Sequence, residues 1–176
     1  MKLFFILISL LTFIFGEEPA DRGYIVQVGD ECPDFILHMM DGSTLSKSDL
    51  KGNVVVLQFT GSWCSVCRKE MPHLEKDVWQ RFKNEDFILI GIDINEPKDV
   101  VKQFIKEMKT TYPIALDEDY SIFHLFAYKG AGVTRNIVLD KNGKIVYLTR
   151  LFEQDEFNAM IAKIEELLSE NKPLSK

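Results

Sequence analysis

Hydrophobic and polar residues follow one another along the chain in blocks that are typical of an α/β domain. Val54–Phe59 and Phe87–Ile94 are almost continuously apolar, the pattern of strands that are buried on both faces of a sheet. After each run, apolar residues recur every three or four positions, which is the spacing of one buried helix face. The first helix is predicted from Cys64 onward and the second after Pro97. Pro72 lies within the first helix, lacks a backbone donor, and is expected to kink it near its second turn.

Two antiparallel hairpins are predicted, one before and one after these units. Asp41-Gly42 and Asn142-Gly143 are dipeptides that favour tight hairpin turns, and each stands between two short apolar segments. Those segments are Asp34–Met39 with Thr44-Leu45, and Ile137–Leu139 with Ile145–Leu148. A last amphipathic helix follows the second hairpin. This order predicts an α/β fold with a central mixed β-sheet flanked by helices and an added N-terminal β-hairpin.

The first residues have the pattern of a secretory signal peptide. Residues 1–16 contain a lysine, an apolar run of about 13 residues and a small residue, Gly16, before an acidic segment. The run is shorter than the roughly 20 residues that cross a bilayer. We therefore expect residues 1–16 to be a signal peptide, 17–24 a flexible mature N-terminus, 25–170 the folded domain and 171–176 a C-terminal tail. A periplasmic or secreted protein without an integral membrane span in the mature chain follows, and an uncleaved N-terminal anchor is the alternative.

Composition and charge narrow the classes of function. The 176 residues are 46% hydrophobic and 27% charged, which is close to the average of globular domains. The net charge of −6, without a compensating run of Lys or Arg, argues against a nucleic-acid or anionic-membrane partner. The three cysteines are an odd number, so a framework of structural disulfides cannot use all of them.

Two of the cysteines lie where a buried strand is predicted to turn into a helix. Cys64 and Cys67 are separated by two residues, and in this position the spacing indicates a redox-active dithiol. The first turn of a helix presents unpaired N–H groups and the positive end of the helix dipole, which both stabilise a thiolate on Cys64. Cys67 is suited to attack the Cys64 sulfur in a mixed disulfide. We therefore expect a reversible Cys64–Cys67 disulfide and no other cofactor.

A structural zinc site and a permanent disulfide are the structural alternatives for this pair. Zinc would need two more ligands, and the remaining Cys32, His38, His73 and His124 show no paired spacing, so no metal is expected. A permanent disulfide would close a very short loop and add little stability.

The residues around the cysteines resemble those of the TlpA/ResA-type thiol-disulfide oxidoreductases. The resemblance is most specific at Trp63-Cys64-Ser65-Val66-Cys67 and covers nearly the whole mature chain. The other segments that carry it are Gly29–Phe35, Asp41-Gly42, Leu50–Val56, Arg68–Pro72 and Asp140–Ile145. The resemblance implies a thioredoxin-like fold in an exported, often membrane-tethered protein that acts on disulfides of exported proteins, including those of cytochrome c maturation. It also implies an upstream thiol electron donor, and it favours reduction over oxidation.

The sequence departs from that family in the loop expected to lie opposite the cysteines. The family has a cis-proline there, whereas this chain has Thr134. Because a cis bond before a residue other than proline is costly, we expect a trans peptide or a shifted loop. Thr134 and Arg135 are nevertheless candidate substrate-binding residues. Arg135 could supply positive potential to the thiolate, and a solvated loop arginine is the alternative.

Three further residues are assigned candidate roles. Thioredoxins carry a buried acid six residues before the first cysteine, where this chain has Gln58, so Glu70, which matches a glutamate of ResA-like members, is the candidate proton-handling carboxylate. The alternative for Glu70 is an exposed residue that favours the helix dipole. Trp63 is expected to cover the site and form part of a docking surface. Cys32 is expected to act as a small buried hydrophobic residue.

Two other functions stay open beside a protein-disulfide reductase. A thiol peroxidase of the peroxiredoxin group needs a threonine three positions before its reactive cysteine, but Thr60 lies four positions before Cys64. A copper-binding or copper-delivery protein on the same fold has a cysteine pair that is usually one residue wider and a downstream histidine, for which His124 is available.

Overall fold

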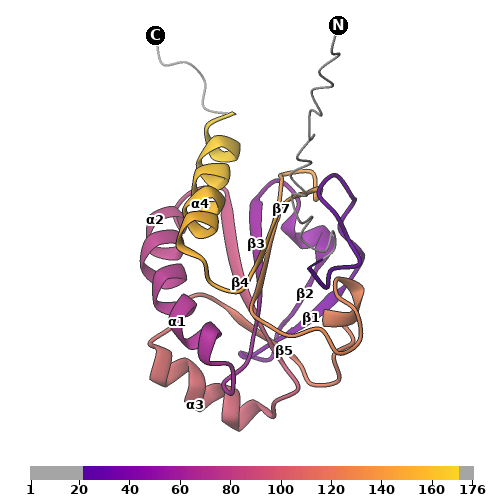
Figure 1. Cartoon of the computed structure of the whole chain (residues 1–176), viewed down its shortest axis with the longest axis vertical. Coiled ribbons are helices and arrows are strands. Elements are labelled where there is room, and N and C mark those ends of the chain that lie inside the picture. Colours follow the sequence, from indigo (N-terminus) through magenta and orange to yellow (C-terminus); the bar gives the residue numbers. More distant parts are fainter. Residues whose placement is uncertain (1–21, 171–176) are drawn as a thin grey trace, which may run out of the picture.

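A mixed sheet of seven strands forms the centre of the computed structural model, which describes residues 22–170 (Figure 1). The strands are β1 (Ile36–Met39), β2 (Thr44–Ser46), β3 (Val54–Thr60), β4 (Phe87–Ile94), β5 (Ile114–Asp117), β6 (Arg135–Leu139) and β7 (Ile145–Arg150). Their order across the sheet is β2-β1-β5-β4-β3-β6-β7. β3 is parallel to β4, and β4 to β5, while the other neighbouring pairs are antiparallel. The two strands with continuous apolar sequences, β3 and β4, thus lie in the interior of the sheet, where both faces are covered.

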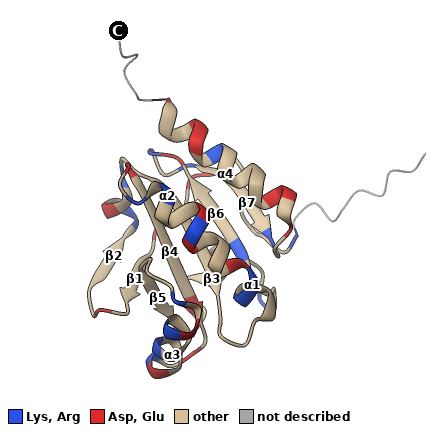
Figure 2. Cartoon of the chain, turned by 90° about the vertical axis from the view of Figure 1, so that its left-hand side faces the viewer, with Lys and Arg blue, Asp and Glu red and all other residues tan. Residues whose placement is uncertain are grey.

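The α-helices pack against one face of this sheet (Figures 1 and 2). They are α1 (Ser65–His73), α2 (Gln80–Phe82), α3 (Lys98–Met108) and α4 (Gln154–Ser169). Val54 and Val56 of β3 point to this face, whereas Val55 and Leu57, at the alternate positions, point to the other. That second face is covered by the N-terminal segment and by two 3-10 turns, Lys47–Leu50 and Phe123–Leu125.

The α/β class and the mixed sheet predicted from the sequence are confirmed. The N-terminal hairpin is present as β1 and β2, and β1 also pairs with β5, so the hairpin extends the main sheet. β5 was not among the predicted strands because its four residues after Pro113 are too short a run to show a clear period.

The helix after the cysteines does not break at Pro72. α1 includes this proline and is followed directly by a π-helical segment, Leu74–Trp79, which leads into α2. The sequence predicts a kink at Pro72. The structure instead shows a change from an α-helix to the wider π-helix two residues after the proline. The predicted apolar stripe is buried along its whole length, at Cys67, Met71, Leu74, Val78 and Phe82.

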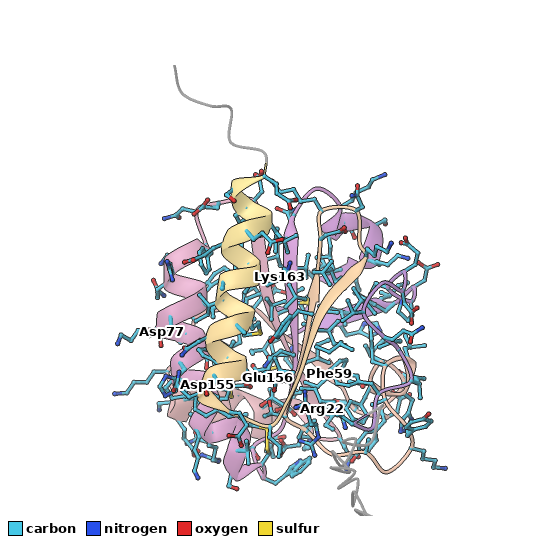
Figure 3. All side chains as sticks on the ribbon, turned by 45° about the horizontal axis from the view of Figure 1, so that its top comes forward. Arg22, Phe59, Asp77, Asp155, Glu156 and Lys163 are labelled. Carbon is cyan, nitrogen blue, oxygen red and sulfur yellow. A yellow bond between two sulfur atoms is a disulfide. The ribbon has the colours of Figure 1, made fainter. Side chains whose placement is uncertain are left out.

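The folded domain begins before residue 25. Tyr24 is 4% exposed, and its hydroxyl donates to the carbonyl of Thr149 at 2.6 Å. Arg22 forms an ion pair with Glu156 in the first turn of α4 (Figure 3). The expectation of a flexible segment over 17–24 is thus wrong for these residues, because both side chains have partners in the domain.

The terminal segments fall outside the residues that the structure describes. The predicted signal peptide 1–16, residues 17–21 and the predicted tail 171–176 all belong to them. Over residues 22–170, no helix combines the length and the apolar character that a membrane crossing requires.

Candidate active site

Both cysteines lie at the start of α1, just beyond the carboxyl end of β3. Cys64 is the N-cap residue of α1 and forms a disulfide with Cys67, with 5.3 Å between the two Cα atoms. The backbone N–H of Cys67 donates to Sγ of Cys64 at 3.1 Å. An amide of the first helical turn therefore points at this sulfur, which stabilises a thiolate there after reduction. Cys64 is 7% exposed and Cys67 is fully buried, so the two sulfurs differ in their access to a substrate.

Glu70 lies one turn beyond Cys67 on α1 and is buried in a hydrogen-bond network. Its Oε2 accepts hydrogen bonds from Gln58 Nε2 at 3.1 Å and from Thr134 Oγ1 at 2.8 Å. Its Oε1 accepts one from Asn136 Nδ2 at 2.7 Å. Burial outweighs these three bonds and raises the pKa of Glu70 to about 7. The alternative of an exposed glutamate is wrong, since only 1% of Glu70 is exposed.

The network extends to residues that the sequence analysis did not identify. Tyr112 donates its hydroxyl to Gln58 Oε1 at 2.8 Å, and Asn136 Nδ2 also donates to Thr149 Oγ1 at 2.9 Å. Gln58 lies within the apolar run of β3, Asn136 is the second residue of β6, and both are fully buried. A polar residue inside an apolar run needs a buried partner, which was a signal at Gln58, whereas Asn136 directly follows two other polar residues in the sequence and carries no such signal.

Replacing Glu70 by glutamine is expected to flatten the pH dependence of stability. The pKa of Glu70 is about 7 in the folded protein, against an ordinary value of 4.5. Between these values the folded state keeps a proton that the unfolded state releases, so the free energy of unfolding falls as the pH rises from about 4.5 to about 7. For a shift of this size the loss is on the order of 3 kcal/mol, and a glutamine does not titrate. Urea unfolding of both proteins at about pH 5 and about pH 8 measures the difference.

The matched control for this variant is Glu118→Gln, which makes the same chemical change at an exposed position. It should follow the wild-type pH dependence. Equal loss of stability between the two pH values in wild type and in Glu70→Gln would contradict a raised pKa at Glu70.

Thr134 lies beside Glu70, in the loop that precedes β6. The peptide bond between Val133 and Thr134 is cis, so the expected trans peptide is wrong. The carbonyl oxygens of Val133 and Thr134 and the hydroxyl of Thr134 all form hydrogen bonds. Arg150 donates to the carbonyls of Val133 and Thr134 at 3.2 and 3.3 Å, the N–H of Leu151 also donates to Thr134, and the Thr134 hydroxyl bonds Glu70. These tertiary contacts, which local sequence does not reveal, fix the orientation of the loop. Thr134 is fully buried, so its side chain contributes to the Glu70 network and is not presented at the surface.

Arg135 is not the solvated loop residue that the sequence suggested. It begins β6 and is 1% exposed. Its guanidinium lies over the ring of Tyr24, 4.4 Å from the ring centroid, and its Nε donates to the carbonyl of Gly132 at 2.8 Å. The cation–π contact and the carbonyl replace water around the charge. The expected substrate-binding role is corrected accordingly, because the enclosed side chain is not available to a substrate.

The remaining two candidates behave as their residue types suggest. Trp63, next to Cys64, is 57% exposed, and its indole lies against Gly61, where a Cβ atom would come within 2.8 Å of Nε1. Gly61 thus leaves the space in which the indole rests beside the dithiol. Cys32 is 1% exposed and burial raises its pKa to about 12, which confirms the interpretation as a small buried hydrophobic residue.

Comparison with known proteins gives consistent matches over this domain. The model of the AhpC/TSA family matches residues 28–148. The thiol-disulfide oxidoreductase ResA of Bacillus cereus is 32% identical over 121 residues, which cover 69% of this chain and 68% of that protein. A solution structure from Bacteroides thetaiotaomicron, described as a candidate protein disulfide isomerase, is 50% identical with a TM-score of 0.81 and covers 84% of this chain and 94% of that one. A crystal structure from Chlorobium tepidum, described as a candidate thiol:disulfide interchange protein DsbE, is 25% identical with a TM-score of 0.73 and covers 82% and 99%.

Proposed function

This chain belongs to the AhpC/TSA family and is a thiol-disulfide oxidoreductase with a thioredoxin-like fold, and on this basis we propose that Cys64 and Cys67 reduce the disulfides of exported proteins. The resemblance, the fold and the enzyme class expected from the sequence are thus confirmed. The observation that carries the proposal is the unequal pair of sulfurs at the helix start, of which Cys64 is the more exposed.

The proposed reaction begins with the reduced dithiol. The thiolate of Cys64 attacks one sulfur of a substrate disulfide, forms a mixed disulfide and releases the first substrate thiolate. Cys67, as a thiolate, then attacks Sγ of Cys64, releases the second substrate thiolate and closes the Cys64–Cys67 disulfide. Two electrons pass to the substrate, and an upstream thiol donor returns them by the same exchange in reverse.

In this scheme, Glu70 accepts the proton that Cys67 loses before its attack. Support comes from its position three residues after Cys67, on the same side of the helix, and from a pKa of about 7, which lets the carboxyl group take up and release a proton near neutral pH. Gln58, Thr134 and Asn136 hold the carboxylate in place. The Glu70→Gln variant is then expected to shift the thiol titration of Cys67 as well as the stability profile.

Substrate and location complete the proposal. The relatives are named for disulfide chemistry. Because Cys64 is mostly buried and Trp63 is exposed, the substrate that fits this surface is a disulfide in an unfolded or flexible polypeptide segment. Trp63 would contact the apolar residues beside that disulfide. Residues 1–16 are proposed to direct the chain out of the cytoplasm. Outside the cytoplasm disulfides form and persist, so their removal needs a reductant there.

Three assays on one sample test the function. The reduced protein is expected to reduce insulin disulfides, to turn over hydrogen peroxide no faster than its Cys64→Ser variant, and to show no tight stoichiometric binding of copper(I). The contacts of Thr60 argue against the peroxidase, because its hydroxyl donates to Sδ of Met71 at 3.6 Å. Peroxide turnover without disulfide reduction would replace the proposal by a peroxidase, and copper binding without reduction would replace it by copper delivery.

A further inference from the structure

Ser62, two residues before Cys64, is held at each of its three polar groups. Its backbone N–H and its hydroxyl both donate to the carboxylate of Glu96. Its carbonyl accepts a hydrogen bond from Arg68 Nε at 2.7 Å, and Arg68 is paired with Glu107 of α3 at 3.0 Å. The loop between β3 and α1 is therefore tied to α1 itself and to the segment that precedes α3.

A second carboxyl group, Asp93, belongs to the same corner of the molecule. It lies near the end of β4, is paired in register with Thr60 of β3, and is fully buried. No donor in the described part of the chain bonds either of its carboxyl oxygens. Burial, then the charge of Glu96, and then a side-chain hydrogen bond between the two carboxyl groups raise the pKa of Asp93 to about 8. Two carboxyl groups placed in this way hold one negative charge between them at neutral pH.

The elements packed around the pair supply no other partner for Asp93. In the sheet its neighbours are uncharged, and the charged residues near Ser62 line a cleft between α1 and α3. These neighbours are Thr60 and Leu116 in the sheet, and Arg68, Asp99 and Glu107 in the cleft. Because Arg68 is paired with Glu107, the cleft provides no unpaired cation that would stabilise a second carboxylate.

From this arrangement we infer that Glu96 is a positioning residue for the loop that carries Trp63 and Cys64, and that ionisation of the neighbouring Asp93 weakens the hold of Glu96 on Ser62. The inference rests on the proposed role of Cys64 as the nucleophile. The Glu96 carboxylate accepts two hydrogen bonds from Ser62, and hydrogen bonds to a carboxylate are about twice as strong as those between neutral groups. They fix where Cys64 lies relative to the first-turn amides of α1. When Asp93 loses its proton at alkaline pH, repulsion between the two carboxylates weakens the hold on Ser62.

An NMR titration of the Asp93 carboxyl group in the oxidised protein tests the pair directly. In the wild type we expect a midpoint of about 8. Glu96→Gln removes the like charge and should lower that midpoint by about one unit, while burial keeps it above the ordinary carboxyl range. The backbone N–H resonance of Ser62 should follow the same titration and lose this dependence in Asp93→Asn. The exposed control Glu118→Gln should leave both signals unchanged.

Reduction of insulin disulfides tests the consequence for catalysis. Glu96→Gln should lower kcat/KM about tenfold at neutral pH, because both hydrogen bonds from Ser62 lose a charged acceptor. Asp93→Asn leaves Glu96 as the one carboxyl group of the pair, so the ratio of its rate to the wild-type rate should rise as the pH passes about 8. A residue that only stabilises the fold would not produce this pH-dependent ratio. Should Glu96→Gln fail to fold, Ser62→Ala removes one of the same bonds from the other side and should lower kcat/KM about threefold.

Two results would overturn the inference. One is a titration of Asp93 in the ordinary carboxyl range. The other is wild-type kinetics in Ser62→Ala together with wild-type kinetics in any folded Glu96→Gln protein. The NMR titration needs no turnover, so it is independent of the proposed function, whose failure would instead appear as full activity of a Cys64→Ser variant.

Discussion

A Cys64→Ser variant is expected to lose disulfide reduction by more than about a thousandfold, whereas a Cys67→Ser variant should accumulate as a covalent adduct with its substrate. The reason is the different access of the two sulfurs. Cys64, at the start of α1, keeps 7% of its surface exposed, and an amide of the first turn points at its sulfur. Cys67 is fully buried, so it reaches only the sulfur of Cys64 and serves to resolve the mixed disulfide. Without Cys67 the first exchange still occurs, and the adduct stays.

Non-reducing gel electrophoresis followed by mass spectrometry of the adduct measures this expectation, and insulin reduction gives the rate. Cys32→Ser is the matched control, because the Cys32 thiol is buried with a pKa of about 12 and should not take part. Adducts that form with Cys64→Ser, but not with Cys67→Ser, would show that the roles of the two cysteines are reversed.

The dithiol was predictable from sequence because everything that defines it is local. The two cysteines are separated by two residues, and the apolar run before them and the helical period after them fix the strand and the helix on either side. The helix start then accounts for the amide that points at Cys64, as the structure has it. No contact between distant parts of the chain enters this prediction.

The surroundings of Glu70 depend on contacts that no local pattern encodes. Thr134 and Asn136 lie 64 and 66 residues further along the chain, and they reach Glu70 only because β6 pairs with β3. The spacing from Cys67 and the family resemblance drew attention to Glu70, but whether it was buried or exposed stayed open. The pairing of β6 with β3 decides this, and with it the raised pKa.

The same distinction explains the errors around Arg135. A charged residue next to a loop is most often solvated, and the sequence offered no sign that Tyr24 would lie beneath it. The contact joins residues that are far apart in the chain, since Tyr24 comes from the segment expected to be flexible. One missed contact therefore accounts for two errors, the exposure assigned to Arg135 and the predicted start of the domain.

Replacing Phe59 by alanine is expected to give the largest loss of stability of the variants considered. Phe59 is fully buried near the end of β3, where its ring lies 5.3 Å from that of Phe123 and 5.5 Å from that of Phe126, between centroids (Figure 3). Removing a buried phenylalanine side chain costs about 3–5 kcal/mol, from lost burial and from the cavity that remains. The free energy of unfolding of a domain is typically only about 5–15 kcal/mol, so this substitution would remove a large part of it.

Guanidinium unfolding of the oxidised protein measures this loss, with Ile36→Ala as the control at a side chain that is 58% exposed and should change stability by less than about 0.5 kcal/mol. Phe59 belongs to the same apolar cluster as Cys64 and Cys67, and it lies three residues before Ser62 in the sequence. A cavity at this point would let the loop and the start of α1 settle toward the sheet, so folded Phe59→Ala protein should also reduce insulin more slowly than the Ile36→Ala control. If Phe59→Ala cost less than about 1 kcal/mol, the aromatic cluster of Phe59, Phe123 and Phe126 would not be what stabilises this end of the sheet.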